Sequence, residues 1–280
     1  MTRAGIVESA RVAARPPEHW YHGYVFDLDG TVWLGGRPLP GAVEVLRELH
    51  AVGRRVTFVS NNTLHTAAAY ASQLRSLGIP AAPADVITPA ALTCEYLSEH
   101  KFTRVHAICE APLRRQLRGA GFELTRRPEE VECVIASFDR HLTYAKLLLG
   151  HRAIELGAAF VATNADRACP MEDGLWPDAA AVIGALEGST GVEVSTIIGK
   201  PSARMMAAAL RRLGLPPSAC IMVGDRAETD VRMARGSGVS AALVLTGAGA
   251  SRRGAEEADF VVADLRQLLP AGAFGEAAGR

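Results

Sequence analysis

The sequence predicts an α/β fold in which a doubly wound parallel sheet carries helices on both faces. Two observations favour it: short apolar runs alternate with helix-like stretches along most of the chain, and several of these runs end in polar residues. Length points the same way, since 280 residues exceed the usual size of one domain and leave room for a second unit.

The elements are expected in three groups. The first has strands at 24–28 and 55–60 and helices at 41–52 and 66–77. The second has strands at 105–109, 131–137 and 159–163 and helices at 89–100, 113–120 and 143–156. The third has strands at 194–198, 219–223 and 241–245 and a helix at 201–213.

These groups divide the chain into a core and an insert. The core is expected at 21–83 and 187–270, and the inserted α/β unit at 84–186. Residues 1–20 lack a clear period and contain two prolines, so we expect a loose arm there, and the Ala/Gly-rich residues 271–280 are expected to fray.

Composition excludes several classes of function. Thirty basic residues balance thirty acidic ones, which argues against binding to nucleic acid or an anionic membrane and favours a small partner. Five scattered cysteines without a C-x-x-C pair predict neither a zinc cage nor a disulfide framework. No signal peptide or apolar stretch of about 18 residues is apparent, so a cytoplasmic protein is expected.

Asp27 and Asp29 end the first apolar run and precede Gly30. Residues two apart in a strand point the same way, so both carboxylates would face one spot. Two like charges about 4 Å apart repel by roughly 4 kcal/mol at an effective dielectric near 20, so the pair calls for a proton, a metal ion or a cationic ligand. The alternative is a solvated turn in which Asp29 and Gly30 supply geometry alone.

Two further runs end in groups that suit an anion. Ser60-Asn61-Asn62-Thr63 offers hydroxyl and amide donors, although an N-cap followed by a loop would explain the same residues. Lys200, one of only three lysines, precedes Pro201 at the expected first turn of a helix, a combination suited to phosphate. The alternative for Lys200 is a solvated surface lysine.

A fourth run ends in acids. Asp225 lies at the strand tip and could complete an oxygen-rich magnesium site. Glu228 and Asp230 follow in the first turn of a helix, where they could simply favour the helix dipole. Because parallel strands open their carboxyl ends onto one crevice, all four groups are expected to converge.

With these residues in place, the chain resembles the haloacid dehalogenase superfamily of phosphotransferases. Its four motifs appear in order as Asp27-Leu28-Asp29-Gly30-Thr31, Ser60-Asn61-Asn62, Gly199-Lys200-Pro201 and Gly224-Asp225 through Asp230. The insert resembles the C2a cap of the NagD and p-nitrophenylphosphatase-like subgroup. The resemblance covers roughly residues 22–265 and implies a Rossmann-like core with an inserted α/β cap.

The resemblance also implies roles for the motif residues. Asp27 would attack phosphorus, and Asp29 would protonate the leaving alcohol and then activate water. Mg²⁺ would bind Asp27, the backbone carbonyl of Asp29, and Asp225, while Ser60, Asn61 and Lys200 would hold the phosphoryl oxygens. Asp230 would orient Lys200 or a metal-bound water, and Glu228, where aspartate is frequent, would alter hydrogen bonding around the metal.

The cap is expected to choose the substrate, because the core touches mainly the phosphate. The candidates follow cap strands: Asp139, Arg140 and His141 after one, and Asp166 after another, each with a surface loop as the alternative. Trp176 makes the lining unusual. After it, Asp178 stands where the subgroup has a glycine-rich turn, so we expect a loop that approaches the substrate less closely.

The sequence thus predicts a Mg²⁺-dependent phosphatase that acts on a small metabolite, such as a glycerol, glycolate, sugar or sugar-like phosphate, through an aspartyl-phosphate. The alternatives are phosphoryl transfer to an alcohol acceptor and a protein with this fold that senses a metabolite without turnover. No nucleic-acid or membrane partner is expected, and a homodimer through the cap is the assembly that we consider.

Overall fold

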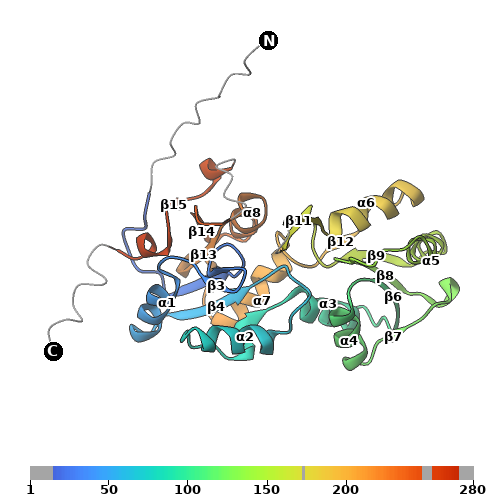
Figure 1. Cartoon of the computed structure of the whole chain (residues 1–280), viewed down its shortest axis with the longest axis horizontal. Coiled ribbons are helices and arrows are strands. Elements are labelled where there is room, and N and C mark those ends of the chain that lie inside the picture. The colour runs from blue at the N-terminus through green and yellow to red at the C-terminus, as the bar shows by residue number, and fades with distance from the viewer. Residues whose placement is uncertain (1–14, 172–173, 248–253, 271–280) are drawn as a thin grey trace, which may run out of the picture.

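Two parallel sheets organise the computed structural model of the chain, which describes residues 15–171, 174–247 and 254–270 (Figure 1). The larger sheet has six strands, in the order β15 (Phe260–Val262), β14 (Ser240–Val244), β13 (Cys220–Gly224), β1 (Gly23–Asp27), β4 (Arg55–Val59) and β5 (Val86–Ile87). The smaller sheet has five, in the order β12 (Thr196–Ile197), β9 (Ala159–Ala162), β8 (Cys133–Ala136), β6 (Arg104–Ile108) and β7 (Glu123–Leu124).

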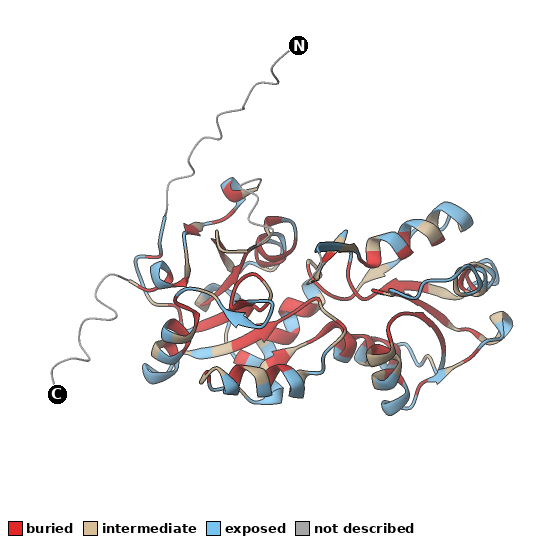
Figure 2. Ribbon diagram, in the orientation of Figure 1, coloured by how far each residue is buried: buried red, intermediate tan, exposed pale blue. Residues whose placement is uncertain are grey.

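Helices cover both faces of the larger sheet. On one face α1 (Ala42–Ala51) and α2 (Ala67–Ser76) pack against Tyr24, Phe26 and Phe58. On the other, α7 (Ala203–Leu213) and α8 (Arg232–Gly236) pack against the intervening residues of the same strands. Both faces of the strands are therefore buried, which explains why they read as continuous apolar runs (Figure 2).

The smaller sheet is covered in the same way and forms the inserted cap. The helices α5 (Tyr144–Glu155) and α6 (Ala179–Thr190) pack on one face, and α3 (Pro89–Glu99) and α4 (Ala111–Gly119) on the other. The cluster that contains α3 and α4 continues into the α7 face of the larger sheet. The predicted α/β fold, a doubly wound core with an inserted α/β cap, is the observed one.

Two short antiparallel hairpins project beside the sheets. One consists of β2 (Trp33–Leu34) and β3 (Arg37–Pro38), and the other of β10 (Ala168–Met171) and β11 (Gly174–Pro177). Neither was expected from the sequence, because strands this short carry little periodicity. The helix α6 was also missed; it begins after Asp178, whose Oδ1 accepts a hydrogen bond from the Ala179 N–H at 2.6 Å.

The predicted boundaries of the insert, at residues 84 and 187, do not coincide with the division of the strands between the two sheets. β5 follows residue 84 yet pairs with β4 in the larger sheet. β12, expected in the core, pairs instead with β9 at the edge of the smaller sheet. The physical reason is that each short strand completes the sheet edge nearest to it, which a boundary drawn from composition does not reveal.

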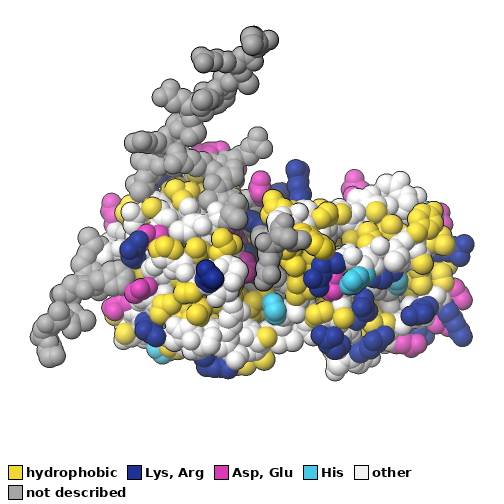
Figure 3. All heavy atoms as spheres, in the orientation of Figure 1, with side chains coloured by type: hydrophobic (Ala, Val, Ile, Leu, Met, Phe, Trp, Pro, Cys, Tyr) yellow, Lys and Arg dark blue, Asp and Glu magenta, His cyan; other side chains and the backbone are white. Residues whose placement is uncertain are grey.

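The predicted loose arm is also shorter than expected. The Arg15 N–H donates to the Val261 carbonyl at 2.8 Å, and Trp20 packs on the core. The predictions for residues 1–14 and 271–280 lie outside the described residues. Basic and acidic side chains are both spread over the face seen in Figure 3, in keeping with their equal numbers. No helix in the described ranges is long and apolar enough to cross a bilayer.

Candidate active site

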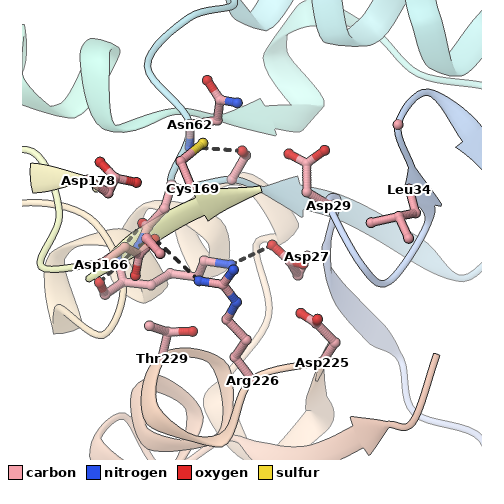
Figure 4. Close-up of a pocket in the computed structure, with 15 residues that line it drawn as sticks. Asp27, Asp29, Leu34, Asn62, Asp166, Cys169, Asp178, Asp225, Arg226 and Thr229 are labelled. Carbon is pink, nitrogen blue, oxygen red and sulfur yellow. Dashed lines mark hydrogen bonds and ion pairs between the residues drawn. The ribbon is translucent and has the colours of Figure 1, made fainter. Parts of the chain in front are cut away.

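Three neighbouring strands of the larger sheet bring polar side chains to one edge. Asp27 is the last residue of β1, Ser60 follows β4, and Asp225 follows β13. Because β13, β1 and β4 are adjacent and parallel, their carboxyl ends open at the same edge. Asp27 and Asp225 accordingly face the same cavity (Figure 4).

Lys200 reaches this edge from the smaller sheet, three residues beyond the end of β12. Its Nζ donates to Asp27 Oδ1 at 2.5 Å and to Asp230 Oδ1 at 2.7 Å. Burial opposes the charge of the ammonium, but the carboxylates of Asp230 and Asp27 outweigh it, so the pKa of Lys200 is raised. Lys200 therefore stays charged and holds two carboxylates together.

Asn61 fixes the backbone that carries this lysine. Its Oδ1 accepts from the Lys200 N–H at 2.8 Å, and its Nδ2 donates to the Lys200 carbonyl at 3.1 Å. The cap is attached at the same residue: Nδ2 also lies 3.2 Å from Asp166 Oδ2, and Asn164 donates to the Asn61 carbonyl at 3.1 Å. The side chain of Asn61 thus anchors the backbone of Lys200 and the cap, whereas the sequence analysis expected it to hold a phosphoryl oxygen.

Asp27, Asp225 and Asp230 form a compact cluster of buried carboxylates. Each offers one oxygen, and the three oxygens lie within 4.8 Å of one another. Burial, followed by the charges of Asp27 and Asp230, raises the pKa of Asp225 to about 8. One lysine does not balance this negative charge, and carboxylate oxygens are the ligands that Mg²⁺ prefers, so the donor set fits that ion.

This cluster of side chains adds Asp230 to two of the expected ligands, and the third expected ligand, the backbone carbonyl of Asp29, stays a prediction. Asp230 joins Asp27 and Asp225, whereas the Asp29 side chain is not part of it. Asp29 instead accepts a hydrogen bond from Trp33 Nε1 at 2.9 Å. Burial, and then the charge of Asp27, raises the pKa of Asp29, which favours a carboxyl group that can hold a proton.

Glycines make room for these carboxylates. A Cβ on Gly30, where φ is +96°, would fall on the Asp225 carboxylate, and so would a Cβ on Gly247. A Cβ on Gly224 would likewise overlap Asp230. The motif glycines therefore provide the close approach that the cluster requires. Gly247 had no sequence signal of its own and was missed.

One cavity of about 130 Å³ collects most of the predicted site residues. Those that line it are Asp27, Asp29, Ser60, Asn61, Asp166, Lys200 and Asp225. Its wall also includes side chains that were not assigned from the sequence, namely Leu34, Asn62, Cys169, Asp178, Arg226 and Thr229. Arg226 and Thr229 were visible inside the fourth motif, and Asp178 as a departure from a glycine-rich turn.

Three predicted cap residues do not line this cavity. Asp139 Oδ2 pairs with Lys146 Nζ at 2.6 Å, and Arg140 Nε pairs with Glu110 at 2.8 Å. His141 is exposed. Neighbouring charges in the cap pair with Asp139 and Arg140 and hold them away from the cavity, so a role of these residues in substrate specificity stays a prediction.

Two other predicted residues also lie off this cavity, and their roles stay predictions. Trp176 lies opposite Cys169 in the β10–β11 hairpin, but only Cys169 of the pair lines the cavity. Glu228 is exposed on the irregular helical turn Ala227–Val231, whereas its neighbours Thr229 and Asp230 are buried. Glu228 is the one exposed residue of this turn, so the longer acid lies away from the buried carboxylate cluster.

Comparisons with known proteins give a consistent set of similarities. A model for haloacid dehalogenase-like hydrolases matches residues 24–123, and one described as HAD-hydrolase-like matches residues 197–268. Over 226 residues the chain is 35% identical to the sugar-phosphatase AraL of Bacillus subtilis (strain 168), covering 80% of this chain and 83% of that protein.

Solved structures of similar fold are also phosphatases. A p-nitrophenyl phosphatase from Archaeoglobus fulgidus superposes with a TM-score of 0.82 at 30% identity, covering 89% of this chain and 98% of that one. A glycerol phosphate phosphatase from Mycobacterium tuberculosis in complex with magnesium gives a TM-score of 0.77 at 32% identity, covering 89% of this chain and 76% of that one.

Proposed function

Because the chain belongs to the haloacid dehalogenase-like hydrolases and is a phosphoric monoester hydrolase of the NagD-like subgroup, we propose that it is a Mg²⁺-dependent phosphatase of a small metabolite. The proposed substrates are glycerol, glycolate, sugar or sugar-like phosphates. The observation that carries the proposal is the contact of Lys200 with Asp27 beside Asp225, in a cavity that also holds Asp29.

The first half of the proposed reaction transfers the phosphoryl group to the protein. A carboxylate oxygen of Asp27 attacks phosphorus while the bond from phosphorus to the ester oxygen breaks, and the leaving oxygen takes a proton from Asp29. In the second half, water attacks the phosphorus of the aspartyl-phosphate and gives one proton to Asp29, while the bond from phosphorus to the Asp27 oxygen breaks and restores the carboxylate. Inorganic phosphate leaves, and Asp27 and Asp29 return to their starting states.

Ser60 and Lys200 would hold the phosphoryl oxygens during both halves. Lys200 is preorganised for this, because Asn61 fixes its backbone and Asp230 its ammonium group. We assign Asn61 an indirect part in phosphate binding for the same reason. Asp27, Asp225 and the backbone carbonyl of Asp29 would hold the Mg²⁺, with Asp230 close by. When bound, that ion supplies a Lewis acid that offsets the charge of the phosphoryl group.

The size of the cavity favours a small substrate. At about 130 Å³ it is smaller than the roughly 300 to 1,000 Å³ typical of pockets for drug-sized ligands. The relatives named above act, by their names, on sugar, glycerol and p-nitrophenyl phosphates. A cytoplasmic location and a homodimer through the cap stay predictions from the sequence.

A phosphate-release assay tests this function. The purified chain should release inorganic phosphate from p-nitrophenyl phosphate and from at least one small phosphorylated polyol or acid, and chelation of Mg²⁺ should stop the release. Product analysis in the presence of glycerol separates hydrolysis from transfer to an alcohol. Undiminished release after complete removal of divalent ions would contradict the assignment of the metal.

Replacing Asp29 by asparagine should lower turnover roughly 10²- to 10⁴-fold, because the amide cannot give a proton to the alcohol or take one from water. Attack by Asp27 on p-nitrophenyl phosphate needs less help, since p-nitrophenolate is a weak base. Single-turnover kinetics should therefore show a smaller loss for that ester than for an alkyl phosphate. Equal losses for both esters would argue against proton donation by Asp29.

A further inference from the structure

The cavity has a second acidic wall, opposite the carboxylates of the strand ends. Asp166 and Asp178 both come from the cap and lie together on one side in Figure 4, with Asp29, Asp27 and Asp225 across from them. Asp178 is only 6% exposed and ends the segment between β11 and α6. Asp166 also accepts from Asn61 Nδ2 at 3.2 Å, so these two carboxylates form the cap side of the cavity, next to the proposed phosphate site.

Helix capping explains only in part why an aspartate occupies position 178. Its Oδ1 accepts the Ala179 N–H at 2.6 Å, a bond that serine, threonine or asparagine would also make without burying a charge. Burial, and then the charge of Asp166, raises the pKa of Asp178 to about 7. The charge of Arg226 and a hydrogen bond with Asn164 also favour its carboxylate but do not offset this rise, so the acid is costly at this position. A further partner for its carboxylate would explain why an acid stands here.

The cation in this wall is already engaged with the other acid. Arg226 Nη1 lies 3.9 Å from Asp166 Oδ2, and no ion pair to Asp178 occurs among the residues that the structure describes. A substrate carboxylate entering here would meet Asp178 and an arginine that already faces Asp166. Hydroxyl groups, in contrast, can donate to both carboxylates.

A buried hydroxyl in the same cavity also indicates a ligand site. Thr229 lines the cavity and is 9% exposed, and its Oγ1 has no hydrogen-bond partner within the described part of the chain. Buried polar atoms are normally satisfied, so an orphan that faces a cavity indicates a group supplied by a ligand. A hydroxyl of the substrate could both donate to Thr229 and accept from it.

We propose that Asp166, Asp178 and Thr229 form the subsite for the alcohol half of the substrate, and that it accepts neutral polyol phosphates and rejects phosphates that carry a carboxylate. This inference rests on the proposed function and narrows it, since glycolate phosphate is then a poor substrate. Asp178 is the determinant that the sequence analysis marked as a departure, because the family resemblance implies a glycine-rich turn at that position.

The test compares kcat/KM for glycerol 3-phosphate and 2-phosphoglycolate in the wild type, in Asp178→Asn and in Thr229→Val. The wild type should prefer glycerol 3-phosphate by roughly tenfold or more. Asp178→Asn keeps the helix cap but loses the charge, so the ratio should fall about tenfold, chiefly through KM for both esters. Thr229→Val should lower kcat/KM for glycerol 3-phosphate and leave kcat/KM for 2-phosphoglycolate nearly unchanged.

Asp264→Asn is the matched control, because Asp264 caps a short helix outside the cavity through a hydrogen bond from the Arg266 N–H. It should keep the wild-type ratio. If Asp178 had only a structural role, its replacement would lower kcat/KM for both substrates together and preserve their ratio, and this result would overturn the inference. A wild type that prefers 2-phosphoglycolate would overturn it as well. Release of phosphate from no ester at all would overturn the proposed function and this inference with it.

Discussion

Replacing Asp27 by asparagine should lower phosphate release roughly 10⁴- to 10⁶-fold and leave the chain folded. The amide has nearly the shape of the carboxylate and can keep the hydrogen bonds with Thr31 at 3.2 Å and with Lys200. It cannot attack phosphorus, because its oxygen lacks the negative charge of the nucleophile. The loss should appear in kcat with alkyl and aryl phosphates alike.

The expected fold of this variant is checked by circular dichroism and thermal unfolding. One crowded carboxylate is removed, so the melting temperature should stay near that of the wild type. The Asp264→Asn variant serves again as control and should retain full activity. A phosphorylated protein trapped from the wild type by acid quench, and absent from Asp27→Asn, would identify the nucleophile directly. Substantial turnover by Asp27→Asn would disprove the assignment.

Replacing Lys200 by methionine should damage both catalysis and stability. Catalysis should fall roughly 10²- to 10³-fold, because a preorganised charge on the phosphoryl oxygens is lost. The free energy of unfolding should fall by about 3 to 5 kcal/mol, because Asp27 and Asp230 keep their buried charges without the ammonium that joined them. Denaturant unfolding without divalent ions measures this loss.

The loss of stability in this variant should depend on pH. Burial, against the opposing effect of Lys200, already raises the pKa of Asp230 to about 6, and removal of the lysine raises it further. A carboxyl with a raised pKa in the folded state binds more protons there than in the unfolded state. The variant is therefore most stable at low pH and loses stability as pH rises through that pKa.

The control for Lys200→Met is Lys101→Met, since Lys101 is exposed at the end of α3. It should change neither the activity nor the free energy of unfolding measurably. If Lys200→Met unfolded with the wild-type free energy across pH 5 to 8, the buried ion pairs would not contribute as described. Restoration of its activity by an added alkylamine would support the role of the ammonium.

Much of the fold was predictable because its strands are buried on both faces. Runs such as Gly23–Asp27 and Cys220–Gly224 have no polar side to confuse the pattern, and each stops where a charged residue begins. Asp27, Ser60 and Asp225 stand at these strand ends, so the sequence also predicted that they lie at one edge of the sheet. What the pattern could not give was pairing between short strands, so the membership of β5 and β12 was missed.

The cap residues were harder to place, because charged side chains in the cap have partners close by in the fold. Arg140 looked like an anion receptor in the sequence, yet Glu110, thirty residues earlier, lies 2.8 Å from it. Such pairings depend on which loops meet above a sheet. Asp178 illustrates the converse, since a departure from an expected glycine pointed to the wall of the cavity without revealing its role.

Lys200 lies at the junction of the two sheets, and this separates it from the other charged groups of the cavity. Asp27 and Asp225 are held by adjacent strands of one sheet, but the lysine follows β12, which pairs with β9 of the cap. The backbone of the lysine is also held by Asn61, which lies just after β4, and α7 of the core begins three residues later. The segment that carries the catalytic ammonium therefore bridges the two sheets, and we expect a change in the angle between cap and core to act on it directly.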